Sequence, residues 1–494
     1  MKKTLTVMLA LTLLNSVAVT MPPQPVRAET VPMVYLVPGD EPQDNAVVLE
    51  MVNEKLAEDG VGVEVELQYI PWDAWDQRLN LKLSTGDPFD MFTVMNDRVT
   101  ITNYASRDAL TDLTEIMEAE GENILANNPE IMMQSGQVAG RQYGIPAYWF
   151  ESALGPELTM RKDIMEKYGI EEVPTDFESL TAAYEKVMAE WEGPTKPYFP
   201  MIGQSAYDFG LMNKTYDEYP FFVYDGIFMV TQDGKVQNFF ETEIFKQNSA
   251  NARLWYEKGL INPDILVFTN DQLTNQLNSG DWFIHPGTIG NVIPLQANYP
   301  DLTVDDFEWI DFAPDKGNVR PYGTRNMQAV PQSSEHPESG VKFINWLYAD
   351  QDNYDLFLYG REGIDYNKVD ERGREQIIEP ALNTPLYYFS DWMIGNVTYE
   401  RVDLNAPTIT NEALYQPNET AVDSIAAGMQ FDATEVQTKL ADVKTQIAAS
   451  IAPIATGVQD YDSSIEAALE QLRAAGIDDL VAEFQAQLDA HLAE

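Results

Sequence analysis

Residues 33–94 alternate between strand and helix patterns, and this alternation constrains the fold more than any other feature of the sequence. Apolar residues such as Val48, Val52 and Leu56 recur at helical spacing, whereas the flanking segments carry the short apolar or alternating runs typical of strands. The five expected elements, in the order strand, helix, strand, helix, strand, are 33–37, 45–59, 61–70, 72–83 and 89–94. This order predicts an α/β lobe built on a mostly parallel sheet.

Residues 158–492 carry a second series of elements. Asp233-Gly234 is a strong two-residue turn signal and predicts a hairpin over 221–240. The expected helices are 176–191, 243–258, 272–277, 338–349, 351–359 and three helices that share 433–492. No tandem repeat or low-complexity linker divides the chain, so we expect its two halves to be interleaved.

The first 28 residues have the pattern of a removable export signal. Lys2 and Lys3 precede a mostly apolar run over 5–19, and the small residues Val26 and Ala28 occupy the positions that a signal peptidase reads. The apolar run is too short for a membrane anchor, and no later run approaches the length of a transmembrane helix. We therefore expect a signal peptide over 1–28 and a secreted protein, periplasmic or extracellular, that begins near Glu29.

The chain contains no cysteine, so it can form neither a disulfide nor a thioether-linked lipid. It has 494 residues, of which 44% are hydrophobic and 11% aromatic, and this is enough for a large core and two lobes. The formal net charge is −48. A field of that sign repels nucleic acids and anionic lipid surfaces, so we expect neither as a partner, and most acids are expected to form a solvated surface.

Several short motifs occur in an order and at a spacing that are typical of one family. They are 84–90, 140–146, 161–170, 174–177, 254–261 and 279–282. Together with the strand and helix over 33–59, they resemble the extracellular solute-binding proteins of ATP-driven importers. The branch is the large, sugar-type one, the maltose-binding-like cluster of family 1, and the similarity extends over almost the whole mature chain.

The C-terminal part narrows the resemblance further. Residues 345–350, 358–366 and 431–492 resemble a subgroup of these proteins that are largely lipoproteins, anchored through a cysteine at the cleavage point. Here Ala28-Glu29 occupies that point. The chain departs from the subgroup in this respect, and we expect a protein that is not lipid-anchored through cysteine.

The resemblance implies a two-lobed periplasmic-binding-protein-like fold of type II, in which several crossing segments join the lobes. Each lobe would be a mixed, mostly parallel sheet flanked by helices, with extra C-terminal helices. The crossings would lie near Ile145, over 311–322 and near Gly363. The first lobe would hold 29–146 plus 318–363, and the second lobe 147–317 plus 364–494, including the C-terminal helical extension.

A sugar-binding cleft needs aromatic rings that stack on pyranose faces and planar polar groups that grip hydroxyls. In open α/β sheets such groups come from loops that follow strands. The candidate ligand-binding residues are Asp40, Trp72, Asp87, Tyr148, Trp149, Glu151, Trp282, Tyr322, Arg361 and Glu362. Tyr148, Trp149 and Trp282 are favoured, because loops beside a hinge rarely need three large rings merely to pack.

Each candidate also has a purely structural interpretation. Asp40 is about as consistent with a turn or a helix cap as with ligand contact, and Arg361 is more typical of an ion pair between lobes. Core packing is expected for Trp191, Trp255 and Trp346 on amphipathic helices. Trp75 is balanced between core and site, and Tyr387, Tyr388 and Trp392 form a later aromatic cluster.

Enzymatic alternatives are less favoured. Thiol catalysis and cysteine metal sites are excluded, and the histidines (His285, His336 and His491) lie in no metal-binding or nucleophile motif. No phosphate-binding loop or EF-hand calcium loop is present, and we expect no cofactor and no metal. A secreted glycoside hydrolase needs only two carboxylates, for which Asp87 with Asp90, or Glu151 with Glu362, could serve.

We therefore expect the secreted substrate-binding component of an importer. It would act as a monomer, capture a small solute by closure of two lobes, and deliver the solute to membrane permease subunits. The aromatic content favours an oligosaccharide over an ion. The alternatives are the glycoside hydrolase and a glycan sensor or adhesin that feeds no transporter.

Overall fold

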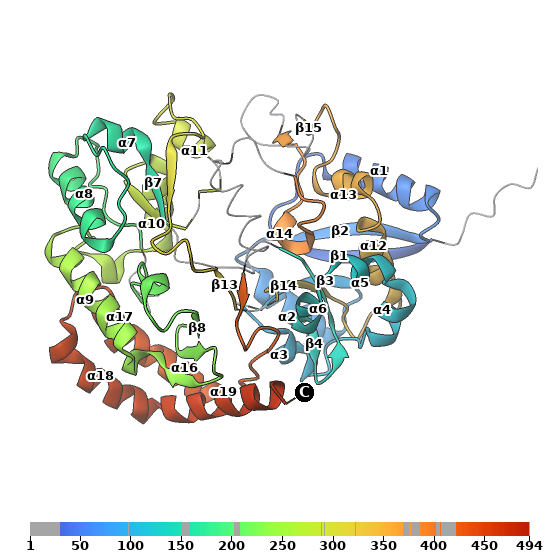
Figure 1. The fold of residues 1–494 in the computed structure, drawn as a ribbon. Helices are drawn as coiled ribbons and strands as arrows, with labels where there is room; N and C mark the ends of the chain where they lie inside the picture. Colours follow the sequence, from blue (N-terminus) through green and yellow to red (C-terminus); the bar gives the residue numbers. More distant parts are fainter. Residues whose placement is uncertain are drawn as a thin grey trace, which may run out of the picture.

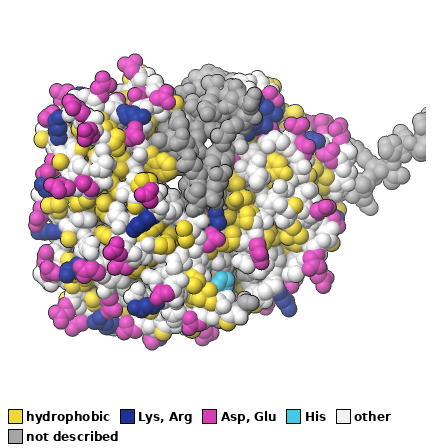
Figure 2. Space-filling view, in the orientation of Figure 1, with side chains coloured by type: hydrophobic (Ala, Val, Ile, Leu, Met, Phe, Trp, Pro, Cys, Tyr) yellow, Lys and Arg dark blue, Asp and Glu magenta, His cyan; other side chains and the backbone are white. Residues whose placement is uncertain are grey.

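The computed structural model of the chain consists of two lobes joined by crossing segments (Figure 1). It describes residues 30–493 except 97, 150–157, 202–207, 288, 291, 322, 369–374, 378–385, 402–405 and 407–420. Among the described residues, no helix combines the length and the apolar character needed to cross a membrane. Acidic side chains are scattered over the described surface of both lobes (Figure 2).

The first lobe is built on a five-stranded sheet in the order β2-β1-β3-β14-β6. Its strands are β1 (Val31–Pro38), β2 (Val63–Ile70), β3 (Met91–Met95), β6 (Gly144–Pro146) and β14 (Asn326–Ala329). Strands β2 and β3 run parallel to β1, whereas β14 runs antiparallel to β3 and β6. The carboxyl ends of β1, β2 and β3 therefore share one edge with the end of β6, from which the chain leaves for the second lobe.

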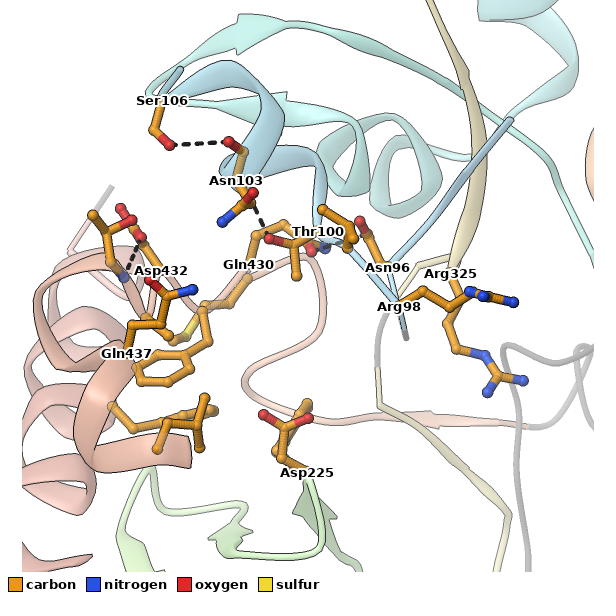
Figure 3. A pocket seen from close by; sticks show the side chains of 18 of the residues that line it. Asn96, Arg98, Thr100, Asn103, Ser106, Asp225, Arg325, Gln430, Asp432 and Gln437 are labelled. Carbon is orange, nitrogen blue, oxygen red and sulfur yellow. Dashed lines mark hydrogen bonds between the residues drawn. The ribbon is translucent and has the colours of Figure 1, made fainter. Parts of the chain in front are cut away.

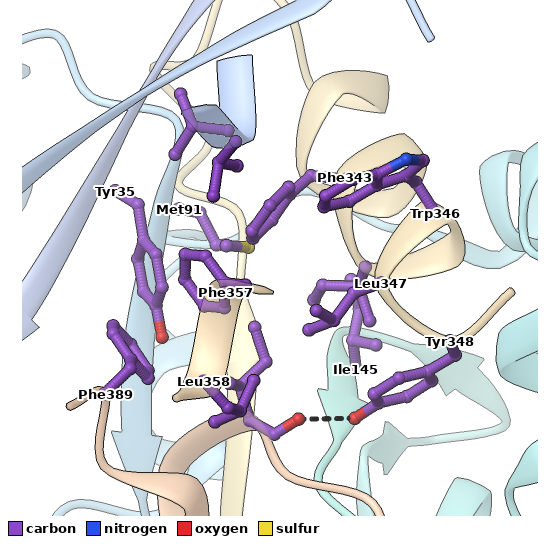
Figure 4. Close-up of a cluster of buried hydrophobic side chains, with 14 of the residues drawn as sticks. Tyr35, Met91, Ile145, Phe343, Trp346, Leu347, Tyr348, Phe357, Leu358 and Phe389 are labelled. Carbon is purple, nitrogen blue, oxygen red and sulfur yellow. Dashed lines mark hydrogen bonds between the residues drawn. The ribbon is translucent and has the colours of Figure 1, made fainter. Parts of the chain in front are cut away.

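Helices cover both faces of this sheet. They are α1 (Asn45–Glu58), α2 (Trp75–Thr85), α3 (Ile101–Ala105), α4 (Thr114–Glu120), α5 (Glu122–Asn127), α6 (Glu130–Ser135), α12 (Glu338–Leu347), α13 (Gln351–Leu358) and α14 (Asp391–Ile394). Tyr35 on one face packs with Phe343 and Phe357 of α12 and α13 (Figure 4), whereas Leu36 on the other packs with Trp75 of α2. Successive side chains of β1 thus contribute to two cores, one on each face of the sheet.

A buried hydrogen-bond network fixes the position of β14 in this sheet. The Gln328 side chain is 1% exposed, and its Oε1 accepts from Tyr35 Oη at 2.8 Å and from Thr93 Oγ1 at 3.1 Å. Its Nε2 donates to the Met393 carbonyl at 2.6 Å. One side chain therefore connects β1, β3, β14 and α14.

The second lobe contains two three-stranded sheets, and both are antiparallel. Their strands are β7 (Leu158–Arg161), β11 (Ile284–Pro286) and β12 (Phe307–Ile310), and β8 (Phe221–Tyr224), β9 (Phe228–Thr231) and β10 (Val236–Asn238). The expectation of a mostly parallel sheet is therefore wrong for this lobe. The predicted hairpin at Asp233-Gly234 joins β9 and β10, and a second Asp-Gly pair, Asp225-Gly226, joins β8 and β9 with positive φ at both residues.

The second lobe contains helices at the places predicted over 176–191, 243–258 and 272–277, and two shorter ones that are absent from the expected helices, over 162–167 and 293–296. They are α7 (Lys162–Lys167), α8 (Phe177–Glu190), α9 (Glu243–Glu257), α10 (Asn270–Ser279) and α11 (Ile293–Gln296). Asp176 caps α8 as expected, because its side chain accepts from the Ser179 amide at 2.8 Å. Gly280 ends α10 in the left-handed conformation.

The C-terminal helices share a core with the β8–β10 sheet. They are α16 (Gln437–Gln446), which continues through a π-helical segment (Ile447–Ile451) into α17 (Ala452–Ala455), followed by α18 (Tyr461–Ala475) and α19 (Ile477–His491). Phe484 of α19 stacks on Phe228 of β9 with ring centroids 4.7 Å apart. Because this core is continuous, the C-terminal helices belong to the second lobe.

Two of the crossing segments pair with each other. β13 (Val319–Arg320), on the way back to the first lobe, runs parallel to β17 (Val422–Asp423), and Arg320 Nη1 lies 2.8 Å from Asp423 Oδ1. The crossing expected near Gly363 is placed differently. Tyr366, Phe389 and Met393 are buried in the core of the first lobe, although all three follow 363. The lobe boundary at 363/364 is therefore corrected to a position after α14.

We predict that Gln328→Leu lowers the free energy of unfolding by about 2–4 kcal/mol. The substitution removes the shared acceptor of the Tyr35 and Thr93 hydroxyls and the donor to the buried Met393 carbonyl, and such losses are substantial in the interior. Chemical denaturation measures the change. Gln332→Leu, at an exposed position just beyond the same strand, is the control and should stay within about 0.5 kcal/mol. Equal effects of the two substitutions would contradict the anchoring role.

Candidate ligand-binding site

Two tryptophans stack on each other at the edge of the first lobe that faces the second. Trp72 lies in the loop after β2 and Trp392 lies on α14, and their ring centroids are 5.9 Å apart at an interplanar angle of 28°. Trp72 is 43% exposed. We call this pair the tryptophan platform. It presents a large ring at an edge where open α/β sheets bind ligands.

Arg98 completes the platform from the loop after β3. Its guanidinium carbon lies 5.7 Å from the Trp72 ring centroid, and its Nη2 lies 2.5 Å from Asp76 Oδ2 at the start of α2. The cation is thus held over the ring by a carboxylate. Gly39, in the loop after β1, approaches Trp72 Nε1, so three strand ends converge on this indole.

The first crossing segment lies beside the platform. The Tyr148 amide donates to the Gly395 carbonyl at 3.1 Å, and the Val397 amide donates back to the Tyr148 carbonyl at 3.0 Å. The Trp149 ring packs so closely on Gly395 that an added Cβ there would lie 3.0 Å from it. Trp149 is therefore held next to the end of α14, the helix that carries Trp392.

Asp391 helps to orient this short helix. Its carboxylate accepts from the Tyr388 hydroxyl, and also from the Trp392 amide at 2.8 Å. Burial raises the pKa of the Asp391 carboxyl, and these hydrogen bonds oppose the rise. The aromatic cluster expected around Tyr387, Tyr388 and Trp392 thus supports the platform.

An interlobe cavity of about 780 Å³ adjoins the platform, and Arg98 lines it (Figure 3). Such a volume suits a small-molecule ligand. Its apolar lining includes the rings of Phe222, Phe431 and Phe484 from the second lobe. Amide and hydroxyl side chains from both lobes supply its polar part, namely Asn96, Thr100, Asn103, Gln430 and Gln437.

One hydrogen bond spans this cavity wall. Asn96, directly after β3 of the first lobe, donates through Nδ2 to Gln430 Oε1 at 3.0 Å. Gln430 follows β17 and precedes the C-terminal helices. The cavity is therefore a property of the assembled lobes rather than of either one alone.

Trp282 does not offer a ring to the cleft, which corrects one of the favoured expectations. It is 0% exposed and packs on Phe307, with ring centroids 6.3 Å apart. The fully buried Arg161 guanidinium lies 5.7 Å from its centroid and donates to the Gly280 carbonyl at 2.7 Å. The indole thus belongs to a core of the second lobe.

Asp87 is also placed away from the site. It is exposed and precedes β3, so it lies at the edge of the sheet opposite the carboxyl ends. Asp40 is exposed in the loop after β1, on the correct edge. Glu151 and Tyr322 lie outside the described residues.

Arg361 and Glu362 form ion pairs within the first lobe. Arg361 Nη2 lies 2.5 Å from Asp44 Oδ2, and its Nε lies 2.6 Å from Asp365 Oδ2. Glu362 lies 3.5 Å from Lys368 Nζ. Arg361 therefore fastens the loop after β1, which carries Asp40, within one lobe rather than between lobes. Among the described residues, no group of three histidine or acidic side chains is arranged to hold a metal ion.

The comparison with protein families identifies the class of the chain. The family model for bacterial extracellular solute-binding proteins matches residues 39–354, which is more than half of the sequence. The protein therefore belongs to this family. A second family model, described as a domain of unknown function, matches residues 425–493, which include the C-terminal helices.

Proteins of the same class are similar to this chain over nearly its whole length. A carbohydrate ABC transporter substrate-binding protein of Streptococcus pneumoniae is 23% identical over 467 residues, covering 92% of this chain and 89% of the relative. The solved structure of an N-glycan transport solute binding protein from the same species has a TM-score of 0.77 at 20% identity, covering 94% of this chain and 99% of that one. An HMO binding, ABC-transporter associated solute binding protein of Bifidobacterium longum infantis has a TM-score of 0.69 at 16% identity, covering 94% and 99%. These similarities confirm the two-lobed fold.

Arg98 and Trp392, which contact Trp72, were missed by the sequence reasoning, as were the polar residues that line the cavity. Arg98 directly follows a predicted strand, so the rule that selected Trp72 would also have selected it. Trp392 was noted only as part of an aromatic cluster, because nothing local in the sequence shows that it meets Trp72, more than 300 residues away.

Replacement of Trp282 and of Trp72 by alanine should distinguish a core tryptophan from a tryptophan of the site. We predict that Trp282→Ala lowers the free energy of unfolding by about 3–5 kcal/mol, because it empties a core. Trp72→Ala should lower it by about 1 kcal/mol, since only the stacking on Trp392 and Arg98 is lost. Denaturant titration followed by circular dichroism measures both. A larger loss for Trp72→Ala than for Trp282→Ala would contradict this assignment.

Proposed function

We propose that this protein is the substrate-binding component of an ABC importer and captures an oligosaccharide between its two lobes. The observation that carries the proposal is the tryptophan platform, exposed at the edge of the first lobe and joined by Arg98 to the interlobe cavity. Membership of the solute-binding family and the carbohydrate-transporter relative support the same function.

The chemistry of the lining suits a sugar. A pyranose presents C–H faces to aromatic rings and hydroxyls to planar amides, and each needs a partner when water is excluded. Trp72 supplies an accessible ring, while Asn103 and Gln437 supply amides from opposite walls of the cavity. We propose Trp72, Trp149 and Arg98 as ligand-contacting residues, with Asp40 at the rim.

Ligand capture would proceed by closure of the lobes about the crossing segments. A ligand that touches both lobes binds the closed arrangement more tightly than the open one, and therefore shifts the population toward closure. The cavity has walls from both lobes, as this mechanism requires. The permease subunits of the importer would then recognise the closed form, with the binding protein acting as an exported monomer.

A hydrolase is not favoured by the described carboxylates. Asp90 accepts hydrogen bonds from the Val34 amide at 2.9 Å and from Ser334 at 2.7 Å, and Glu362 pairs with Lys368. Each of these acids has a structural partner, and Asp87 lies at the far edge of the sheet. We therefore propose binding without turnover.

A glycan panel tests this proposal. Thermal unfolding of the exported chain is measured with oligosaccharides of several classes, alongside peptides and amino acids. A cognate oligosaccharide at about 100 times its Kd should add about 2.7 kcal/mol of stability. It should also reduce the radius of gyration in solution scattering. Stabilisation by peptides alone, or release of shortened sugars detected by chromatography, would contradict it.

We further predict that Trp72→Ala weakens binding of the stabilising oligosaccharide about tenfold, because a stacking surface is lost. Titration calorimetry measures the change. Trp191→Ala is a matched control, since Trp191 also stacks on another ring, that of Tyr168, with centroids 5.9 Å apart at 30°, but lies in the second lobe away from the cavity. An equal loss in the two variants would remove Trp72 from the proposed site.

A further inference from the structure

The charge of the interlobe cavity is opposite to that of the molecule. The whole chain carries 31 Lys and Arg against 79 Asp and Glu. The cavity is lined by four cations, Arg98, Arg107, Arg325 and Lys444, and by two acids, Asp225 and Asp432. Asp432 is itself engaged as a cap, because its Oδ1 accepts from the Thr434 amide at 2.9 Å. Arg98 is paired with Asp76, but the lining still carries more cations than acids, in contrast to the molecule as a whole.

Arg107 and Lys444 are the most informative of these cations. Among the described residues, neither lies within ion-pair distance of a carboxylate. Arg107 follows α3 of the first lobe, where its Nε donates to the Asn103 carbonyl at 3.0 Å and its guanidinium lies 5.8 Å from the Tyr104 ring centroid. Lys444 is in the last turn of α16 of the second lobe. Cations thus line the cavity from both lobes.

A second lysine on the same helix, Lys439, serves as a comparison for Lys444. Lys439 of α16 lies outside the cavity and pairs with Asp479 of α19 at 2.6 Å. Other cations outside the cavity donate to backbone carbonyls instead, as Lys186 does to Gly169 at 2.8 Å and Lys196 to Met188 at 2.7 Å. What distinguishes Arg107 and Lys444 is that they line an interlobe cavity without an ion-pair partner among the described residues, so they are placed to receive an anion from outside.

We propose that the oligosaccharide captured by this protein is acidic, with its anionic group held between Arg107 and Lys444. This inference rests on the proposed function and specifies its substrate class. A carboxylate of a uronic or sialic acid, or a sulfate ester, supplies the same recognition chemistry, a charge-assisted hydrogen bond to each cation. The sugar rings then lie toward the phenylalanines of the cavity and the platform.

The placement of the cations also links the negative charge to closure. Arg107 and Lys444 approach from opposite lobes, so closure without a ligand brings like charges together in a partly desolvated space. A bridging anion replaces this repulsion by attraction on both sides. A neutral sugar of the same shape lacks this contribution, so the site discriminates by charge as well as by shape.

Pairs of sugars that differ only in charge test the inference. Trigalacturonate and sialyllactose are each compared with their own methyl ester, and lactose sulfate is compared with lactose. At about 0.01 M salt, at least one acidic probe should bind about tenfold more tightly than its neutral partner in calorimetry. At about 0.15 M salt, where the screening length falls to about 8 Å, this preference should shrink. The carboxylate and sulfate probes distinguish the two sources of charge.

Three variants locate the effect. Arg107→Gln and Lys444→Gln should each lower the acidic-to-neutral preference about fivefold or more, whereas Lys439→Gln on the same helix should retain the wild-type preference. All three positions are exposed, so each variant is expected to fold. Thermal unfolding of the variants without ligand checks this. The inference is overturned if no acidic probe exceeds its neutral partner, or if Arg107→Gln and Lys444→Gln both keep the preference. Binding of neutral glycans in that case leaves the proposed function standing, while no glycan binding at all removes both.

Discussion

The arrangement of the first lobe depends on one buried side chain, Gln328. Its strand returns from the second lobe and must insert between β3 and β6, and a polar group buried there needs all of its partners. The amide takes hydrogen bonds from Tyr35 and Thr93 and gives one to Met393. Four chain segments are thereby fixed relative to one another, including α14, which carries half of the tryptophan platform. The geometry of the ligand edge therefore follows from a hydrogen-bond network in the interior.

The parts of the structure that could be predicted from the sequence are those specified locally. The order from β1 to β3 follows from apolar periodicity, and the ends of α8 and α10 follow from Asp176 and Gly280. Trp72 and Asp40 were found because each lies in a loop after such a strand. Their convergence on one edge follows from parallel pairing, which the strand–helix alternation indicates.

The remainder depends on contacts that no local pattern encodes. Helices α3 to α6 have five to seven residues each, too few to establish a helical period, and none of them was predicted. In the second lobe the sheet of β7, β11 and β12 is antiparallel and joins strands that are distant in the sequence, so no local pattern shows its pairing. Trp282 follows a helix-ending glycine as an exposed ring also could, and only Arg161 and Phe307 bury it. The pairing of Trp72 with Trp392 likewise exists only in the folded lobe.

The parallel pair β13–β17 has a mechanical consequence. Two crossing segments joined by a hydrogen-bonded ladder and by the Arg320–Asp423 ion pair form a ribbon, in which sliding of one segment past the other breaks bonds. Bending perpendicular to the plane of the ribbon breaks none of these hydrogen bonds. The connection therefore bends more easily perpendicular to the ribbon than it shears along it. This pair of segments therefore favours a rocking motion of the lobes over a sliding one, and rocking would bring the outer faces of the two lobes to the same relative orientation at each closure.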